Sequence, residues 1–198
     1  MRFKIVSIRI LICVVLVCLI IVIILGSYLF RPERITSVAN TDTTQNQEQT
    51  HPGLPLRLKI PKINLETKIE YVGLTANGEM ATPEDIADVG WYQLGTRPGE
   101  EGSAVIAGHY GWEDGKASSF DELFTLDPGD KLYVEDDTGV ITTFIVRENK
   151  RFNPEDSAVT VFTSNDGGAH LNLITCEGDW NRNAKSYSKR LVVFTDKE

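Results

Sequence analysis

The sequence predicts an all-β domain, a small closed barrel of about seven to nine strands with one or two short helices, preceded by a single transmembrane helix. Three observations lead to this prediction. Apolar and polar residues alternate with a period of two over much of residues 56–198. Turn sequences rich in Gly, Asp and Pro separate these alternating runs. A long apolar run stands near the N-terminus, and a polar stretch separates it from the rest of the chain.

The apolar run covers residues 10–30 and is 21 residues long. At about 1.5 Å per residue, a helix of this length spans about 31 Å, close to the bilayer hydrocarbon core of about 30 Å. Three basic residues and no acid precede the run, whereas Glu33 dilutes the bases after it, so residues 1–9 are predicted to be cytoplasmic and the remainder extracellular. A cleaved signal peptide is the alternative, but the run is long for one and no Ala-x-Ala site follows it. Cys13 and Cys18 lie within the predicted span as lipid-facing or packing residues.

Residues 31–55 are rich in Thr, Gln, Asn, Ser and Pro and contain hardly any large apolar side chain. Such a composition cannot bury enough surface to offset the entropy of ordering, so we expect a flexible extracellular tether. His51 lies in it and is not a candidate site residue. Residues 56–198, about 140 in number, suit one compact domain with its own core.

The strands of this domain follow from its turns. Asn77-Gly78 and the segment 137–139 are hairpin signals, and the segment 127–130 is a turn that leads into an alternating run. Mostly antiparallel strands are expected at residues 56–60, 69–72, 103–107, 131–134, 141–147, 171–175 and 190–195. A short helix is expected at about residues 118–124, and one helical turn is expected after Pro154.

The charge of the domain narrows its possible partners. Residues 56–198 contain 25 of the 28 acidic and 15 of the 20 basic side chains, a formal charge of −10. Such a surface repels phosphate backbones, so nucleic acid is not expected as a partner. One cysteine and two scattered histidines give no zinc-ligand spacing, and the sequence has no glycine-rich phosphate loop. No metal and no cofactor are therefore expected.

Cys176 is the only cysteine outside the first 30 residues, and it ends the apolar run 171–176 before a polar stretch. A disulfide needs two sulfurs, so a lone thiol in an extracellular domain suggests a nucleophile, with a small buried apolar residue as the alternative. A thiol attacks as a thiolate, and its reference pKa of about 8.5 requires a neighbouring base or cation.

Two histidines and two cations are candidates for this partnership. His109 directly follows the apolar run 104–107 and Gly108, which would place its imidazole at the barrel rim, whereas His170 follows a loop and is predicted to be solvated. Arg190 opens the apolar run 191–194, where a guanidinium could reach over the rim and stabilise an oxyanion. Its neighbour Lys189 is predicted to be exposed. Each residue alone is more often structural than catalytic.

The order of these groups resembles the sortases, membrane-anchored cysteine transpeptidases of Gram-positive cell surfaces. The resemblance rests on Ala-Gly-His at residues 107–109, Leu-Ile-Thr-Cys at 173–176 and Arg-Leu-Val-Val at 190–193, and it covers essentially all of residues 56–198. Further similar segments are Ile-Pro-Lys-Ile at 60–63, Val-Gly-Trp-Tyr at 89–92 and Leu-Asp-Pro-Gly-Asp at 126–130. The Val-Gly-Trp-Tyr segment and the lack of a Tyr-Pro-Phe-like stretch after the cysteine look most like class F.

The resemblance implies a closed eight-stranded barrel in which Cys176 is the nucleophile that cleaves a C-terminal sorting signal similar to Leu-Pro-x-Thr-Gly. It implies that His109 is the general acid and base, that Arg190 stabilises the oxyanion or positions the substrate, and that Thr175 supports the site, with a sheet-facing threonine as the alternative. The implied partners are surface proteins that carry the signal and an acceptor amine from peptidoglycan or a pilin. The enzyme would be a single-pass protein of the cell membrane with its catalytic domain facing the cell wall.

Two other interpretations remain open. An L,D-transpeptidase would also pair Cys with His, although a Ser-x-Gly-Cys context would be expected where Ile174 and Thr175 stand. A catalytically silent binding or assembly module of sortase shape is the second. The sequence leaves open the signal, the acceptor, the oligomeric state and any calcium dependence. The acidic cluster 135–137 is more typical of a solvated hairpin tip than of a calcium site.

Overall fold

The computed structural model describes residues 51–113 and 115–198, without the side chain of Glu113. The predicted cytoplasmic N-terminus, the transmembrane anchor and nearly all of the tether lie outside these residues. Within the described ranges, no helix has the length and apolar character needed to cross a membrane.

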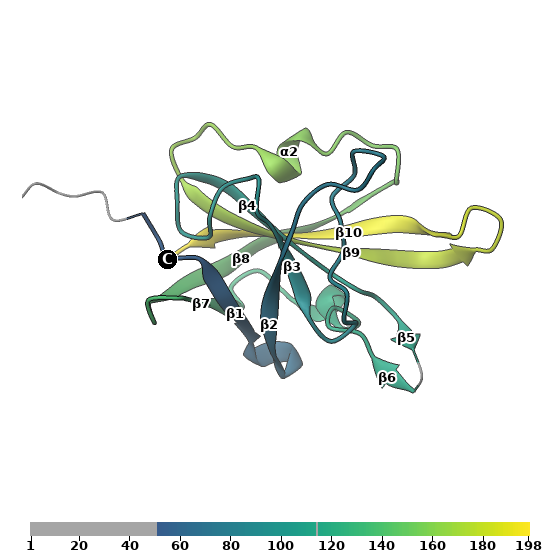
Figure 1. Ribbon diagram of the computed structural model, residues 1–198, viewed down its shortest axis with the longest axis horizontal. Helices are drawn as coiled ribbons and strands as arrows, with labels where there is room; N and C mark the ends of the chain where they lie inside the picture. Colours follow the sequence, from purple (N-terminus) through teal and green to yellow (C-terminus); the bar gives the residue numbers. More distant parts are fainter. Residues whose placement is uncertain (1–50, 114) are drawn as a thin grey trace, which may run out of the picture. The chain divides into compact units, whose positions relative to one another are not determined.

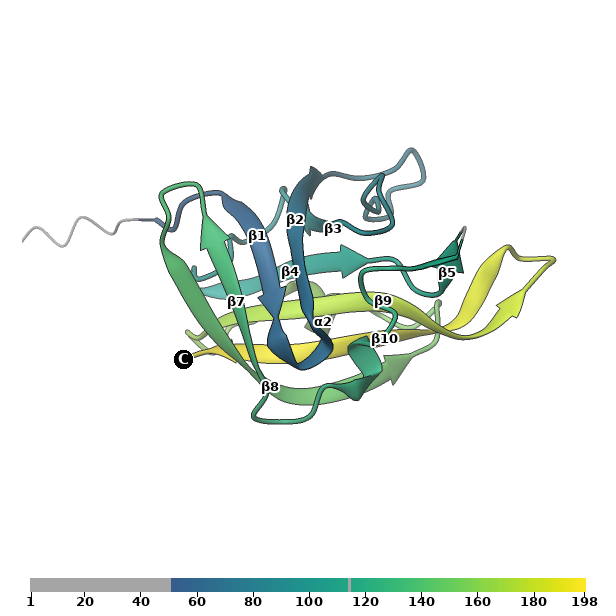
Figure 2. The ribbon, with the colours of Figure 1, turned by 90° about the horizontal axis from the view of Figure 1, so that it is seen from below.

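Eight strands close a barrel in the order β1-β2-β3-β4-β9-β10-β8-β7, which confirms the predicted closed barrel (Figures 1 and 2). Neighbouring strands are antiparallel except for the pairs β2–β3 and β4–β9, which are parallel. The barrel strands are β1 (Pro55–Ile60), β2 (Leu65–Val72), β3 (Val89–Tyr92), β4 (Gly102–Gly108), β7 (Lys131–Asp136), β8 (Ile141–Phe152), β9 (Ala169–Asn181) and β10 (Ser186–Lys197).

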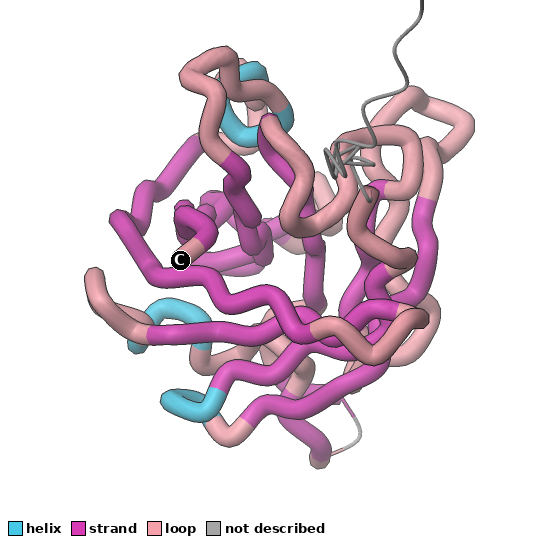
Figure 3. The backbone as a smooth tube through the Cα atoms, turned by 90° about the vertical axis from the view of Figure 1, so that its left-hand side faces the viewer, coloured by secondary structure: helices cyan, strands magenta, loops and turns pink. Residues whose placement is uncertain are grey.

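The remaining elements are short. A separate two-stranded sheet pairs β5 (Trp112–Glu113) with β6 (Lys116–Ala117). The helical segments are η1 (Pro61–Ile63), η2 (Leu123–Thr125) and α2 (Val159–Phe162), and they lie at the outer edge of the strands (Figure 3). The helix predicted at residues 118–124 was wrong in extent, because only the three-residue turn η2 forms there. The helical turn predicted after Pro154 is confirmed as α2.

All seven predicted strands are present, and the eighth strand of the barrel, β3, was missed. Its four residues include Gly90, which lowers β propensity in a sequence. The structure explains that glycine, because a Cβ there would lie 2.9 Å from Cγ1 of Val72 in the neighbouring strand β2.

The largest difference from the prediction concerns β9 and β10. Cys176 does not end its strand, which continues to Asn181, and Arg190 does not begin its strand, which starts at Ser186. The two strands form a hairpin that projects beyond the barrel (Figure 1). Its residues there are mostly exposed on both faces, so no hydrophobic alternation marks them. The pairing shifts between Tyr187 and Lys189, where Gly178 on the opposite strand has a φ of +86°.

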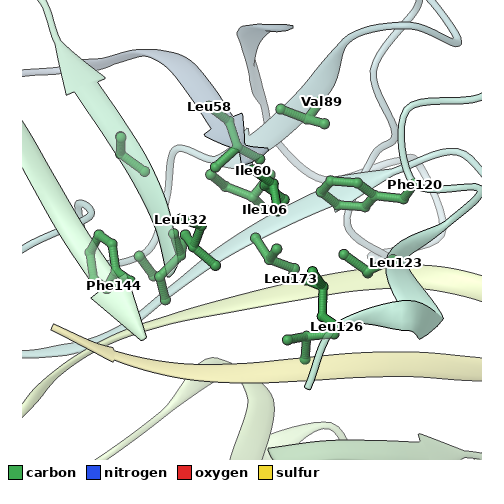
Figure 4. Packing of buried hydrophobic residues seen from close by; sticks show 14 of the residues in the cluster. Leu58, Ile60, Val89, Ile106, Phe120, Leu123, Leu126, Leu132, Phe144 and Leu173 are labelled. Atoms are coloured by element: carbon green, nitrogen blue, oxygen red, sulfur yellow. The ribbon is translucent and has the colours of Figure 1, made fainter. Parts of the chain in front are cut away.

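The barrel interior is filled by one apolar cluster (Figure 4). Side chains from the strands meet there with Phe120, Leu123 and Leu126 from the connection between β6 and β7. The strand residues labelled in Figure 4 are Leu58, Ile60, Val89, Ile106, Leu132, Phe144 and Leu173. This cluster closes the barrel and leaves the opposite faces of β4, β9 and β10 to a second cluster.

The second apolar cluster lies on the outer wall of the barrel. It joins Val105 of β4 and Val192 of β10 to Val161 of α2, with Ile174 of β9 packed against them. The buried amide of Asn172 donates a 2.6 Å hydrogen bond to the carbonyl of Val161, which fastens α2 to β9. Because successive strand residues face opposite sides, Cys176 shares this outer wall with Asn172 and Ile174.

Candidate active site

Three adjacent strands align the three predicted catalytic residues. In the parallel pair β4–β9, Ala107 lies opposite Ile174. His109 and Cys176 each lie two residues further along, so both follow the carboxyl end of this register. On the other side of β9, Arg190 of β10 pairs directly with Cys176. Cys176 therefore lies on the middle strand, β9. The neighbour on one side is β4, which leads to His109, and the neighbour on the other side is β10, which carries Arg190.

Cys176 lies partly buried at a pocket of about 130 Å³ on the outer wall. Arg190 lines the same pocket, together with the apolar side chains of Met80, Phe162 and Ile174. Burial raises the pKa of the Cys176 thiol, and the positive charge of Arg190 opposes this effect without cancelling it. The thiol is therefore mostly protonated at neutral pH, and nucleophilic attack requires a base or a minor thiolate population.

Thr175 ties the cysteine strand to the histidine segment. Its buried hydroxyl donates a 2.8 Å hydrogen bond to the carbonyl of Gly108, the residue before His109. Gly108 has no room for a side chain, because a Cβ there would lie 2.5 Å from the ring of Phe120. The bond and the close packing fix the position of the backbone that precedes His109, and the supporting role of Thr175 in catalysis stays a prediction.

His109 follows β4 directly, as predicted, and lies at the edge of a second pocket of about 500 Å³. Its Nε2 donates to the carbonyl oxygen of Pro83 over 2.9 Å, since a carbonyl can only accept. In the neutral imidazole this bond places the lone pair on Nδ1. The structure thus places His109 at the carboxyl end of β4, where the imidazole is hydrogen-bonded to Pro83 and not to the thiol.

The two candidate cations point in different directions. Arg190 is partly buried, and its guanidinium donates to the carbonyls of Tyr187 and Lys189 and to Oγ of Ser186 over 3.0–3.2 Å. Lys189 is exposed, and its ammonium donates a 2.6 Å hydrogen bond to the side chain of Asn153. The predicted exposure of Lys189 is confirmed, and only Arg190 lines the thiol pocket.

The prediction that His170 is solvated was wrong. The residue is 7% exposed and lies in β9, with Nδ1 2.7 Å from Asp196 and Nε2 2.9 Å from Asp166. Burial alone would lower the pKa of His170, but the hydrogen bonds to Asp166 and Asp196 and their charges outweigh it and raise the pKa above its usual value. The prediction was wrong because Asp166, in the loop before β9, turns its carboxylate back onto the imidazole of His170.

The acidic cluster 135–137 also has a structural role. Asp136 is buried, and its carboxylate accepts hydrogen bonds from the backbone N–H groups of Gly53, Thr138 and Val140. Burial by itself raises the pKa of Asp136. The hydrogen bonds from these N–H groups and from the hydroxyl of Thr138 together lower the pKa by more, so the net shift is downward. In the described part of the chain, no cluster of three His, Cys, Asp or Glu side chains could hold a metal ion.

The sequence did not reveal an apolar groove beside the thiol pocket. A pocket of about 420 Å³ lies between the loop that carries α2 and the outer wall, and it shares Met80, Phe162, Ile174 and Arg190 with the thiol pocket. One signal was present, because both faces of the run 171–175 carry large or apolar side chains. A strand that packs on both faces needs a cover outside the barrel as well as a core within it.

Comparison with known proteins agrees with this architecture. The family model of the Sortase domain matches residues 58–198. The fold is similar to sortase C1 of Streptococcus agalactiae in complex with MTSET, with a TM-score of 0.58 and 24% identity over 73% of this chain and 69% of that chain. It is also similar to sortase C of Clostridium perfringens SM101, with a TM-score of 0.54 and 24% identity over 75% and 72% of the two chains.

A third solved structure, sortase C-1 of Actinomyces oris, gives a TM-score of 0.55 and 25% identity over 72% of each chain. No curated protein sequence matches the chain. The class F assignment therefore stays a prediction.

Proposed function

The chain belongs to the sortase family, and from this premise we propose that it is a membrane-anchored cysteine transpeptidase. It cleaves a sorting signal similar to Leu-Pro-x-Thr-Gly near the C-terminus of surface proteins and joins them to an amine of peptidoglycan or of a pilin. The observation that carries this proposal is the alignment of His109, Cys176 and Arg190 along β4, β9 and β10, beside an open pocket.

In the first half of the reaction, Sγ of Cys176 attacks the carbonyl carbon of the scissile peptide bond. The C–N bond breaks, and protonated His109 gives its proton to the leaving amine. A thioester then links the substrate to Cys176. Arg190 can stabilise the oxyanion, because its three hydrogen bonds to Tyr187, Lys189 and Ser186 leave two of its five N–H groups for a substrate oxygen.

In the second half, an acceptor amine attacks the thioester carbonyl, and His109 now acts as the base that takes a proton from the nitrogen. The C–S bond breaks, its electron pair returns to Sγ, and an amide joins the two proteins. Attack by water would release the substrate instead. The bond from His109 to Pro83 must lengthen or the ring must turn when the imidazole moves a proton at the thiol.

The apolar groove suits the residues that precede the scissile bond. It continues from the thiol pocket along Ile174 and Val192 to Leu74 and Phe152. Aliphatic side chains such as those of Leu and Pro would replace water there and gain about 25 cal/mol for each Å² that they bury.

The predicted anchor suits this function. An enzyme and a substrate held in the same membrane meet at a raised effective concentration. The predicted tether of residues 31–55, whose last residue Pro55 already belongs to β1, would let the catalytic domain reach the sorting signal at the outer surface of the membrane.

The test is to incubate the full chain with a library of sorting-signal peptides and several primary amines, and to identify products by mass spectrometry. We expect one signal class to yield an amide with the added amine together with the released C-terminal fragment. Absence of cleavage with every peptide would favour the silent binding module.

A further inference from the structure

An aromatic pocket lies on the side of His109 that the thiol chemistry above does not use. It has a volume of about 500 Å³, and its walls include His109 with Tyr110, Trp112, Trp180 and Tyr187. These side chains come from the segment after β4, from β5 and from the projecting β9–β10 hairpin. Segments far apart in the sequence therefore supply aromatic rings to one place.

The rings are held in fixed positions. Tyr187 packs edge-on against Tyr110 with ring centroids 5.2 Å apart, and against Trp180 at 5.0 Å. The indole N–H of Trp112 donates a 2.9 Å hydrogen bond to Asp121. Preorganised rings lose little side-chain entropy when a ligand binds to them.

Two of these rings remain open to solvent. Trp112 is 69% exposed and Trp180 is 51% exposed, although both are large and apolar. Exposed apolar surface that gathers in one place commonly marks a binding site. Neither side chain belongs to the barrel core or to the outer-wall cluster, so a place in those clusters does not account for them.

The surroundings of the pocket are acidic. Asp121 lies beside Trp112 and also accepts a hydrogen bond from the backbone N–H of Gly111. Burial raises the pKa of Tyr110 first, and the negative charges of Asp121 and Glu177 raise it further. Glu177 is paired with Arg151, so Asp121 is the acid that leaves a negative charge beside the rings. Aromatic faces within a negative field attract cations.

We propose that this aromatic pocket binds the acceptor as a cationic alkylammonium group on a flexible apolar chain, as in a lysine-type side chain. The proposal rests on the proposed function, because it names the amine for the same site. The ring faces bind the ammonium, and the methylene groups pack against the indoles. A carboxylate next to the amine would be repelled by Asp121, so side-chain amines are favoured over the amine of a free amino acid.

The pocket delivers this amine to the imidazole and then to the thioester. His109 lines the aromatic pocket, and Gly108 before it lines the thiol pocket. The bound ammonium first gives a proton to neutral His109, and the resulting amine attacks the thioester carbonyl. The C–N bond forms and the C–S bond breaks, and the second proton of the nitrogen passes to Sγ of Cys176. The products are an amide, a thiol and an imidazolium, which balances the protons and the charge.

The test uses the full chain and a sorting-signal peptide that forms the thioester. Two acceptors are compared, Nα-acetyl-lysine amide and glycine amide, and the ratio of amide product to hydrolysed product is measured for each. We expect kcat/KM for the lysine derivative to exceed that for glycine amide by about tenfold or more. Trp180→Ala should lower the amide-to-hydrolysis ratio with the lysine derivative about tenfold, and Trp180→Phe should restore most of it.

Two further variants make this test specific. Trp112→Ala should reproduce the loss seen with Trp180→Ala, whereas Leu94→Ala removes another exposed apolar side chain outside the pocket and should leave the ratio unchanged. A ratio within twofold of the unmodified chain in both tryptophan variants, or a preference for glycine amide, would overturn this inference alone. Failure of the unmodified chain to form any thioester would overturn the proposed function as well.

Discussion

The parallel strands β4 and β9 carry a histidine at each end of their pairing, and the two histidines differ in surroundings. At the carboxyl end, His109 is bonded to a backbone carbonyl and borders an open pocket, close in register to Cys176. At the amino end of β9, both ring nitrogens of His170 are bonded to carboxylates, and the residue is buried. The comparison teaches that His109 has the access to a pocket that the proposed proton transfer needs, whereas His170 is held by two carboxylates in a structural role.

The largest effect is expected at the carboxyl end from Cys176→Ala. The variant should lose peptide cleavage and transpeptidation completely, because it removes the nucleophile. Its free energy of unfolding should change by less than about 1 kcal/mol, since the thiol is only partly buried and makes no disulfide. Product analysis and a urea titration measure the two quantities. Turnover that survives the substitution would end the proposal of a thiol enzyme.

His109→Ala and His170→Ala set the two ends of the strand pair against each other. His109→Ala should lower kcat/KM by about 100-fold to 10,000-fold, the usual contribution of a general acid and base. His170→Ala should keep kcat/KM per folded molecule, although it removes a buried ion-paired residue and lowers stability. Initial rates of the two variants, normalised to the folded fraction of each, measure this difference in kcat/KM. The opposite pattern would reverse the assignment of the two histidines.

A smaller effect is expected on the strand next to Cys176. Arg190→Lys should lower kcat/KM by about tenfold to a thousandfold, or about 1.4 to 4 kcal/mol, because an ammonium cannot reproduce the planar fork that reaches an oxyanion. Lys189→Ala is the matched control, and it should change little, since this side chain is bonded to Asn153 away from the thiol. Steady-state kinetics with one peptide checks both variants. Exchanged sensitivities would move the oxyanion role to Lys189.

The smallest effect concerns the pH dependence of stability at the amino end. The pKa of His170 is raised in the folded chain, with Asp166 and Asp196 facing it and Arg147 paired with Asp196. The resulting stabilisation is fully present below the unfolded pKa of about 6.5 and disappears as the pH rises through the folded pKa. The gap in unfolding free energy between the unmodified chain and His170→Ala should therefore narrow as the pH rises from 6 to 9. Urea titrations across this range measure it, and a gap that widens would contradict the raised pKa.

The sequence was sufficient for seven of the eight barrel strands, because apolar residues recur along them and Gly, Asp and Pro mark the turns between them. The short strand β3 was missed because Gly90 weakens its signal. The sequence was insufficient where the alternation of apolar and polar residues disappears. The projecting part of the β9–β10 hairpin has solvent on both faces, so neither the extension of β9 beyond Cys176 nor the start of β10 at Ser186 could be predicted.

The candidate site was predicted in its residues but not in its arrangement. The motifs around His109, Cys176 and Arg190 are local in the sequence, whereas the register that aligns them depends on the strand order β4-β9-β10. The carboxylates around His170 are likewise non-local, since Asp196 comes from the neighbouring strand. Tertiary pairing of this kind leaves no trace in the spacing of single residues.

The most direct test of the central claim is to trap the covalent intermediate. The full chain is mixed with a sorting-signal peptide, quenched in acid within the first turnover, and analysed by intact mass and peptide mapping. The account predicts an added mass equal to the N-terminal fragment of the peptide, located on Cys176 and released by hydroxylamine. Cleavage of the peptide with no adduct on Cys176, or with the adduct on another side chain, would contradict it.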